Sequence, residues 1–215
     1  MPFHFKTNAS SKIFSGNMKP GYVRIIGGKW RSRRLTIPSV ASLRPTPDRV
    51  RETLFNWLMP IIPGAYCLDL FAGSGVLGIE ALSRGAAYVV LVDQSLHVVQ
   101  LLKEELKALE ADNVLVYQAD AFLQLRLLAN THILKHRPFD IVFLDPPYAE
   151  NLLLPSCYEL EEHGLLAQSA HIYLEAQRVI KDNELPPHWQ LVKCQKAGQV
   201  VYHLVHREAH EKSAK

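Results

Sequence analysis

The amino-acid sequence predicts an α/β protein built on a mostly parallel sheet with helices on both faces. Three observations support this fold class. From Ala65 onward, short apolar runs alternate with amphipathic helical segments, the pattern of parallel strands that are covered on both sides. A Gly-rich turn joins the first of these strands to its helix. The chain has 215 residues, of which 48% are hydrophobic, an ordinary size and composition for one globular domain.

The N-terminal part precedes this alternating pattern. Residues 1–20 are polar and aperiodic, so we expect them to be largely disordered. Residues 21–60 are expected to form a basic hairpin and a helix, with strands over 23–26 and 35–37 around Gly27-Gly28. The helix should run from about Asp48 to Met59, with Thr46 as its N-cap and Pro47 in its first turn.

The remaining elements follow in order over residues 61–208, which we interpret as the main domain. Strands are expected at 67–71, 88–92, 114–118, 141–144 and 172–175, and helices at 76–83, 96–109, 121–129 and 151–163. An antiparallel pair near 190–194 and 200–206 closes the sheet. Residues 209–215 form a polar tail.

Several protein classes do not fit the composition. No apolar run approaches the ~18 residues of a membrane span, and the N-terminus has no secretory h-region. The three cysteines are far apart and form no disulfide or zinc pattern, and no paired His spacing suggests a metal site. We therefore expect a cytoplasmic protein without a metal.

Positive charge is concentrated at the N-terminal end. Residues 1–54 hold 11 Lys and Arg against 2 Asp and Glu, whereas the rest of the chain is net acidic. A basic end on an acidic body indicates a polyanionic partner. The candidate phosphate-binding residues are Arg24, Lys29, Arg31, Arg33, Arg34, Arg44, Arg49 and Arg51. One of the two helix arginines could instead pair with Asp48 or Glu52, and Trp30 could either stack on a base or pack in the core.

The motif Asp145-Pro146-Pro147-Tyr148 follows the apolar strand at 141–144. Two prolines end a strand abruptly, so the Asp145 carboxylate, the Pro146 carbonyl and the Tyr148 ring should lie at its carboxyl end. Ligands bind at that edge of open α/β sheets. Two rigid acceptors beside an aromatic ring suit a flat base that carries an exocyclic amino group, and we interpret these four residues as the catalytic motif.

A nucleotide-type cofactor is indicated by the turn from Asp69 to Gly78. The spacing Gly73-x-Gly75-x-x-Gly78 matches the dinucleotide pattern, which alone is weak. NAD is disfavoured because Asp69 at the strand end would oppose a pyrophosphate, and hydride transfer needs neither the motif at 145–148 nor a basic extension. Asp93 ends the next strand and can accept both ribose hydroxyls, while Asp120 can accept from an adenine amino group or cap the following helix.

These residues resemble class I S-adenosylmethionine-dependent methyltransferases that modify amino groups. The segments 25–31, 44–46 and 48–58, with the turn at 69–78 and the motif at 145–148, resemble more closely the bacterial 16S (small-subunit) rRNA guanine-N2 methyltransferases, the methyltransferase D family. The resemblance extends from about Tyr22 to Glu208. Its most specific part is the Arg-Pro-Thr segment with its helix, because the other motifs are shared with many relatives.

The resemblance implies a Rossmann-like, seven-stranded sheet with an N-terminal hairpin and helix. It implies methylation of the exocyclic N2 amine of one guanine in the small subunit or its assembly intermediate, with ribosomal proteins as further candidate partners. S-adenosylmethionine would be held by these residues: Asp69, Phe71, Gly73, Ser74, Gly75, Asp93, Gln94, Asp120 and Ala121. Pro47 lies where relatives often carry a second Thr, which leaves a hydroxyl contact there in doubt.

Other functions remain open from the residues alone. An amino-methyltransferase acting on DNA or on another RNA base would have the same site chemistry, although there is no room for a sequence-reading domain. A glutamine methyltransferase would normally carry Asn in place of Asp145. A non-catalytic rRNA-binding assembly factor is a third alternative, disfavoured by the intact Asp145 and Gly-rich turn.

Overall fold

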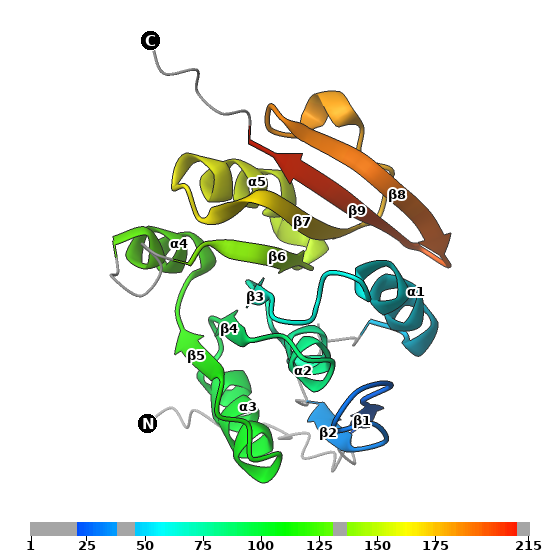
Figure 1. The fold of residues 1–215 in the computed structure, drawn as a ribbon, viewed down its shortest axis with the longest axis vertical. Helices are drawn as coiled ribbons and strands as arrows, with labels where there is room; N and C mark the ends of the chain where they lie inside the picture. Colours follow the sequence, from blue (N-terminus) through cyan, green and yellow to red (C-terminus); the bar gives the residue numbers. More distant parts are fainter. Residues whose placement is uncertain (1–20, 38–45, 131–136, 210–215) are drawn as a thin grey trace, which may run out of the picture.

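The computed structural model describes residues 21–37, 46–130 and 137–209. Its centre is a seven-stranded sheet in the order β5-β4-β3-β6-β7-β9-β8 (Figure 1). Strands β3 to β7 are mutually parallel, and β9 is antiparallel to both of its neighbours. The strands are β3 (Tyr66–Asp69), β4 (Tyr88–Asp93), β5 (Val114–Gln118), β6 (Phe139–Leu144), β7 (Leu166–Ala176), β8 (Trp189–Ala197) and β9 (Val200–Glu208). The predicted fold class is confirmed.

Helices cover both faces of the sheet, and each face has its own apolar cluster. The helices α1 (Asp48–Leu58), α2 (Val76–Ser83) and α3 (Leu96–Ala108) pack on one face. The helices α4 (Ala121–Asn130) and α5 (Leu153–Glu162) pack on the other. This arrangement explains why the central strands are apolar on both sides. Among the described helices, none has both the length and the apolar character required to cross a bilayer.

Several element boundaries differ from the expectation: β1, for example, covers residues 21–24 where a strand over 23–26 was expected, and β8 covers 189–197 where one near 190–194 was expected. The differences at β7 and α5 have clear physical reasons. Strand β7 begins at Leu166, although the sequence predicted a start near residue 172. The prediction missed the first part of the strand because residues 167–169 include exposed polar side chains that interrupt the apolar run. Ser169 nevertheless pairs with Glu208 of β9. Helix α5 begins at Leu153 rather than 151, because Asn151 has a left-handed backbone (φ 51°) that separates it from the preceding turn.

The N-terminal hairpin of β1 (Gly21–Arg24) and β2 (Arg34–Ile37) is docked firmly against the α2–α3 side (Figure 1). The Ile26 N–H donates to Glu80 Oε2 at 2.9 Å, and the Trp30 N–H donates to Ser83 Oγ at 2.9 Å. The Trp30 side chain is buried in the core cluster, so its stacking on a base, left open by the sequence, is not supported. The hairpin is therefore continuous with the core.

Candidate active site

The connection of the strands brings the predicted site together at one edge of the sheet. The chain leaves β3 toward β4 on one side, and leaves β6 toward β7 on the other, so the carboxyl ends of β3 and β6 form the switch point at which open α/β sheets bind ligands. Asp69 ends β3, and Asp145 follows β6 directly. A cavity of about 690 Å³ opens at this edge.

The cavity wall is built from the ends of successive strands and from the segment before α1. Its size falls within the range of small-molecule and cofactor sites. The predicted residues on the wall are Phe71, Gly73, Asp93, Gln94, Asp120, Ala121, Asp145, Pro146, Pro147 and Tyr148. Residues that also line it, but that were not predicted as site residues, include Thr46, Pro47, Glu150, Glu175, Gln177 and Gln199.

The Gly-rich turn is held in shape by backbone conformations that favour glycine. Gly73 and Gly75 have positive φ angles of 50° and 71°, and Gly75 precedes α2 as its N-cap. Asp93 fixes the turn, because its Oδ2 accepts from the Gly73 N–H at 2.9 Å and its Oδ1 accepts from the Ser95 N–H at 2.8 Å. Burial raises the pKa of Asp93, although these two N–H groups oppose the shift.

Three predicted cofactor residues do not line the cavity: Asp69, Ser74 and Gly75. The Asp69 carboxylate is buried and accepts a hydrogen bond from the Gly78 N–H at 3.0 Å. The pKa of Asp69 is raised to about 7, mainly by burial and also by the charge of Asp93, against the lowering effect of the Gly78 N–H. Asp69 therefore supports the turn from within the protein.

Asp120 has one of the two roles that the sequence left open, that of a helix cap, and it also lies on the cavity wall. Its Oδ1 accepts from the Leu123 N–H at 3.0 Å, which caps the start of α4. The same residue lines the cavity next to Ala121.

Glu175 is a buried residue of the cavity wall to which the sequence reading gave no role. It lies near the end of β7, and only 4% of its surface is exposed. Its carboxylate accepts hydrogen bonds from Tyr148 at 2.8 Å, from Tyr173 at 2.9 Å and from Thr46 at 3.4 Å. The sequence did contain a signal that could have identified Glu175 as a site residue, namely a carboxylate near the end of an apolar strand. The same signal identified Asp93.

The environment of Asp145 disfavours its charged form. Burial raises the pKa of Asp145 well above its usual value, and the charges of Glu175 and Asp69 raise it further. A hydrogen bond from Thr46 opposes these effects.

Thr46 is not the N-cap of α1 that the sequence predicted. The N-cap is Pro47, which makes no side-chain capping bond. The Thr46 hydroxyl faces the carboxylates of Glu175 and Asp145 instead.

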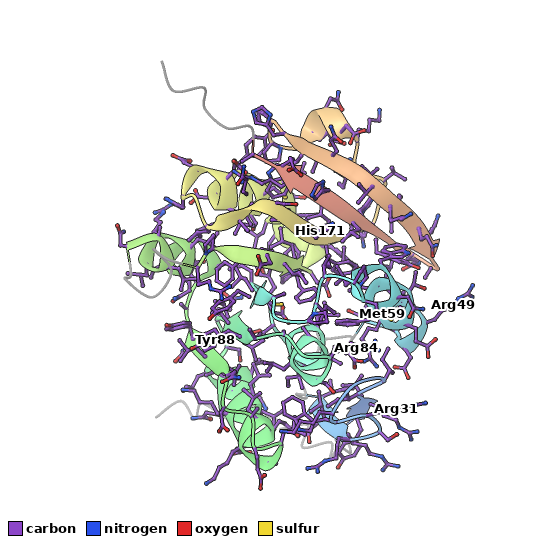
Figure 2. All side chains as sticks on the ribbon, in the orientation of Figure 1. Arg31, Arg49, Met59, Arg84, Tyr88 and His171 are labelled. Carbon is purple, nitrogen blue, oxygen red and sulfur yellow. The ribbon has the colours of Figure 1, made fainter. Side chains whose placement is uncertain are left out.

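Most of the predicted phosphate-binding residues are exposed. This holds for Arg24, Lys29, Arg31, Arg33 and Arg34 on the hairpin and for Arg49 on α1. The labelled side chains of Arg31 and Arg49 point away from the body of the protein (Figure 2). Arg33 also donates to the Ala108 carbonyl at 3.0 Å. Arg44 lies outside the described residues.

Arg51 is the exception among these cations, and its predicted RNA contact is incompatible with its position. Its side chain is fully buried and lies 2.6 Å from Asp48 and 3.5 Å from Glu80. It also donates to the carbonyls of Thr46 at 3.2 Å and Arg24 at 2.9 Å. The sequence left open whether a helix arginine pairs with Asp48 or with Glu52, and the structure shows that Arg51 pairs with Asp48.

A mostly parallel seven-stranded sheet, a Gly-rich turn after its first core strand and an Asp-Pro-Pro-Tyr motif at the switch point define a class I methyltransferase. Comparisons with known proteins agree. The chain belongs to the family described as "Conserved hypothetical protein 95", whose model matches residues 23–206.

The chain is similar to curated proteins and to a solved structure over most of its length. It is 47% identical over 193 residues to "Ribosomal RNA small subunit methyltransferase D" of Escherichia coli (strain K12), a match that covers 90% of this chain and 94% of that protein. It is 44% identical over 195 residues to the protein of the same name from Haemophilus influenzae, with 90% and 97% covered. The structure of yhhF from Escherichia coli superposes with a TM-score of 0.77 at 46% identity, covering 88% of this chain and all of that one.

Proposed function

We propose that this protein transfers a methyl group from S-adenosylmethionine to the exocyclic N2 amine of a guanine in 16S rRNA. The observation that carries the proposal is the position of Asp145, Pro146 and Tyr148 on the wall of the cavity that Phe71 and Gly73 of the Gly-rich turn also line. The relatives named as small-subunit rRNA methyltransferases support rRNA as the substrate. The substrate would be the small subunit or its assembly intermediate, in the cytoplasm.

The residues on the cavity wall fit an adenosine-bearing cofactor. Each Asp93 oxygen accepts one backbone N–H, so further acceptor capacity remains for the two hydroxyls of a ribose. Asp120 and Ala121 would flank the adenine, and Gly73 would allow close approach of the methionine part. S-adenosylmethionine would supply a methyl group on a sulfonium, which is already a strong electrophile.

The protein's own task is to make a poor nucleophile reactive. The lone pair of a guanine amine is delocalised into the ring. We propose that the Asp145 carboxylate and the Pro146 carbonyl accept its two N–H hydrogen bonds and orient the lone pair. As positive charge develops on the nitrogen, Asp145 stabilises it. Because its pKa is raised, Asp145 is also suited to take the proton that the nitrogen loses.

The exposed cations would bring the RNA to this site. Arg31 and Arg49 lie on the hairpin and on α1, and α1 follows Thr46 and Pro47 of the cavity wall. Guanidinium groups bind phosphates bidentately, so these residues would hold the RNA backbone while the target base enters the cavity. Tyr148 would stack on the extruded base.

The test offers labelled S-adenosylmethionine to three substrates in parallel: small subunits that lack the modification, naked 16S rRNA and DNA. Digestion to nucleosides then identifies the labelled base. We expect N2-methylguanosine from the rRNA, with more label in the assembled subunit. Label in DNA or in another base would support a different amino-methyltransferase, and binding to rRNA without transfer would support an assembly factor.

A further inference from the structure

We infer that Glu175 is a positioning residue for methyl transfer, which holds the Tyr148 ring and the Thr46 hydroxyl in place beside Asp145. The inference rests on the proposed function, and it assigns a task to a buried acidic residue that the mechanism above does not use. Glu175 would act through its neighbours and would not touch the reacting atoms.

The strand pairing places Glu175 next to the catalytic motif. Strands β6 and β7 are parallel, with Phe143 opposite Tyr173 and Leu144 opposite Leu174. The next residue after β6 is Asp145, and the next residue of β7 is Glu175. The two carboxylates therefore lie at the same edge of the sheet. Both line the cavity.

Glu175 fixes the partly exposed aromatic ring of the catalytic motif. Tyr148 begins a single 3-10 turn, η1 (Tyr148–Glu150), and 39% of its surface is exposed. Its phenol donates to Glu175 Oε1 at 2.8 Å. Glu175 is itself fixed from the core, because the buried Tyr173 phenol donates to Oε2 at 2.9 Å. The ring is therefore pre-oriented for a base before any base arrives.

The Thr46 hydroxyl links this cluster to Asp145. It lies 3.4 Å from Glu175 Oε2 and also forms a hydrogen bond with Asp145. A hydroxyl has one proton, so it serves one carboxylate at a time. The Thr46 backbone is held in turn by Arg51 Nε, which donates to its carbonyl at 3.2 Å.

The same geometry makes the charge of Glu175 act on Asp145. The groups that face Asp145 are Glu175 and Tyr173 from β7, Asp69 from β3, Thr46 from the segment before α1, and Tyr148 from η1. A nearby negative charge raises the pKa of a carboxyl. Replacing Glu175 by Gln keeps the shape but removes that charge, so the pKa of Asp145 should fall. If Asp145 must be ionised to stabilise the nitrogen, the acidic limb of the pH–rate profile should move to lower pH.

The experiment compares wild type with Glu175→Gln, using single-turnover methylation of unmodified small subunits from acidic to neutral pH. We expect the maximal rate to fall by about 10- to 100-fold while KM and the affinity for S-adenosylmethionine stay unchanged. The acidic limb should shift to lower pH. Tyr173→Phe removes one of the hydrogen bonds to Glu175 and should produce a smaller loss of rate. Glu162→Gln, the same exchange at an exposed site on α5, should match wild type.

A second readout does not depend on turnover. Burial and the charge of Glu175 both raise the pKa of the Tyr148 phenol. Tyrosine ¹³Cζ resonances, with Tyr148 assigned from Tyr148→Phe, should show that this phenol titrates at lower pH in Glu175→Gln than in wild type.

A wild-type rate and an unshifted acidic limb in Glu175→Gln would overturn the inference, as would a change confined to KM or an unmoved Tyr148 titration. An inactive wild-type protein would instead overturn the proposed function, and the Tyr148 titration would still test the hydrogen bond.

Discussion

Replacing Arg51 should destabilise the protein strongly, although Arg49, two residues away, can be replaced at little cost. Arg51 is fully buried, and its guanidinium joins three segments: the hairpin through the Arg24 carbonyl, the start of α1 through the Thr46 carbonyl, and α2 through Glu80. Arg49 is exposed on the same helix. The two residues form a matched pair that differs mainly in burial.

The magnitude follows from the groups that Arg51→Ala would leave unpaired. The two backbone carbonyls would each lose a donor, at about 1–3 kcal/mol for a buried group. Glu80 would keep the Ile26 N–H and Arg84 as partners, so its loss is only partial. Asp48 is 65% exposed, so its ion pair contributes at most about 1 kcal/mol. Together these terms give about 2–7 kcal/mol, a range centred on the roughly 3–5 kcal/mol that breaking a buried pair from one side usually costs.

Urea unfolding followed by circular dichroism measures this difference directly. Arg49→Ala should change the free energy of unfolding by less than about 0.5 kcal/mol and should lower rRNA affinity. If Arg51→Ala proves as stable as Arg49→Ala, then Arg51 does not join these segments, and its assignment as a structural residue is wrong.

Three further predictions concern the pH dependence, the hairpin and the RNA. The pKa of Asp69 is about 7 in the folded protein against 3.8 normally, so its ionisation destabilises the fold as pH rises between those values. Asp69→Asn should therefore flatten the fall in unfolding free energy from about pH 4 to about pH 7, by up to about 4 kcal/mol; an unchanged slope in urea titrations would contradict this. Gly28 has a φ of 76°, and an added Cβ would lie 1.8 Å from the Ser83 carbonyl oxygen. Gly28→Ala should lower stability by about 2 kcal/mol or more, and a wild-type melting temperature would argue against the close docking of the hairpin. Replacing Arg31, Arg33 and Arg34 together with Ala should reduce the slope of log affinity against log salt by roughly 2 in rRNA binding assays. The same slope as wild type would exclude these residues as phosphate contacts.

The fold was predictable because local patterns carry most of it. Short apolar runs and Gly stops located the parallel strands and their helices, and α2 and β5 begin and end where expected. The start of β7 was missed because its exposed residues do not look like a buried strand. A strand of that kind is defined by its partner β9, which lies about 30 residues later in the chain.

The positions of Asp93, Asp120 and Asp145 on the cavity wall were predictable, because a carboxylate just at or after the end of a strand is visible in the sequence. Roles that depend on burial could not be predicted from the sequence. Arg51 lies on the same face of α1 as Leu54 and Leu58, unlike Arg49, but the sequence does not show which partners bury it. Those partners, Glu80 and the carbonyls of Thr46 and Arg24, come together only in the folded protein. Thr46 has the spacing of an N-cap, but its hydroxyl faces two carboxylates that lie about 100 and 130 residues further along the chain.

The most direct test of the central claim separates cofactor binding from chemistry in Asp145→Ala. Calorimetry measures its affinity for S-adenosylmethionine, and a single-turnover assay on unmodified small subunits measures methyl transfer. We predict an affinity like that of wild type and a rate at least ~100-fold lower. A variant that binds the cofactor and still methylates guanine at the wild-type rate would show that the carboxylate at the end of β6 does not activate the amine.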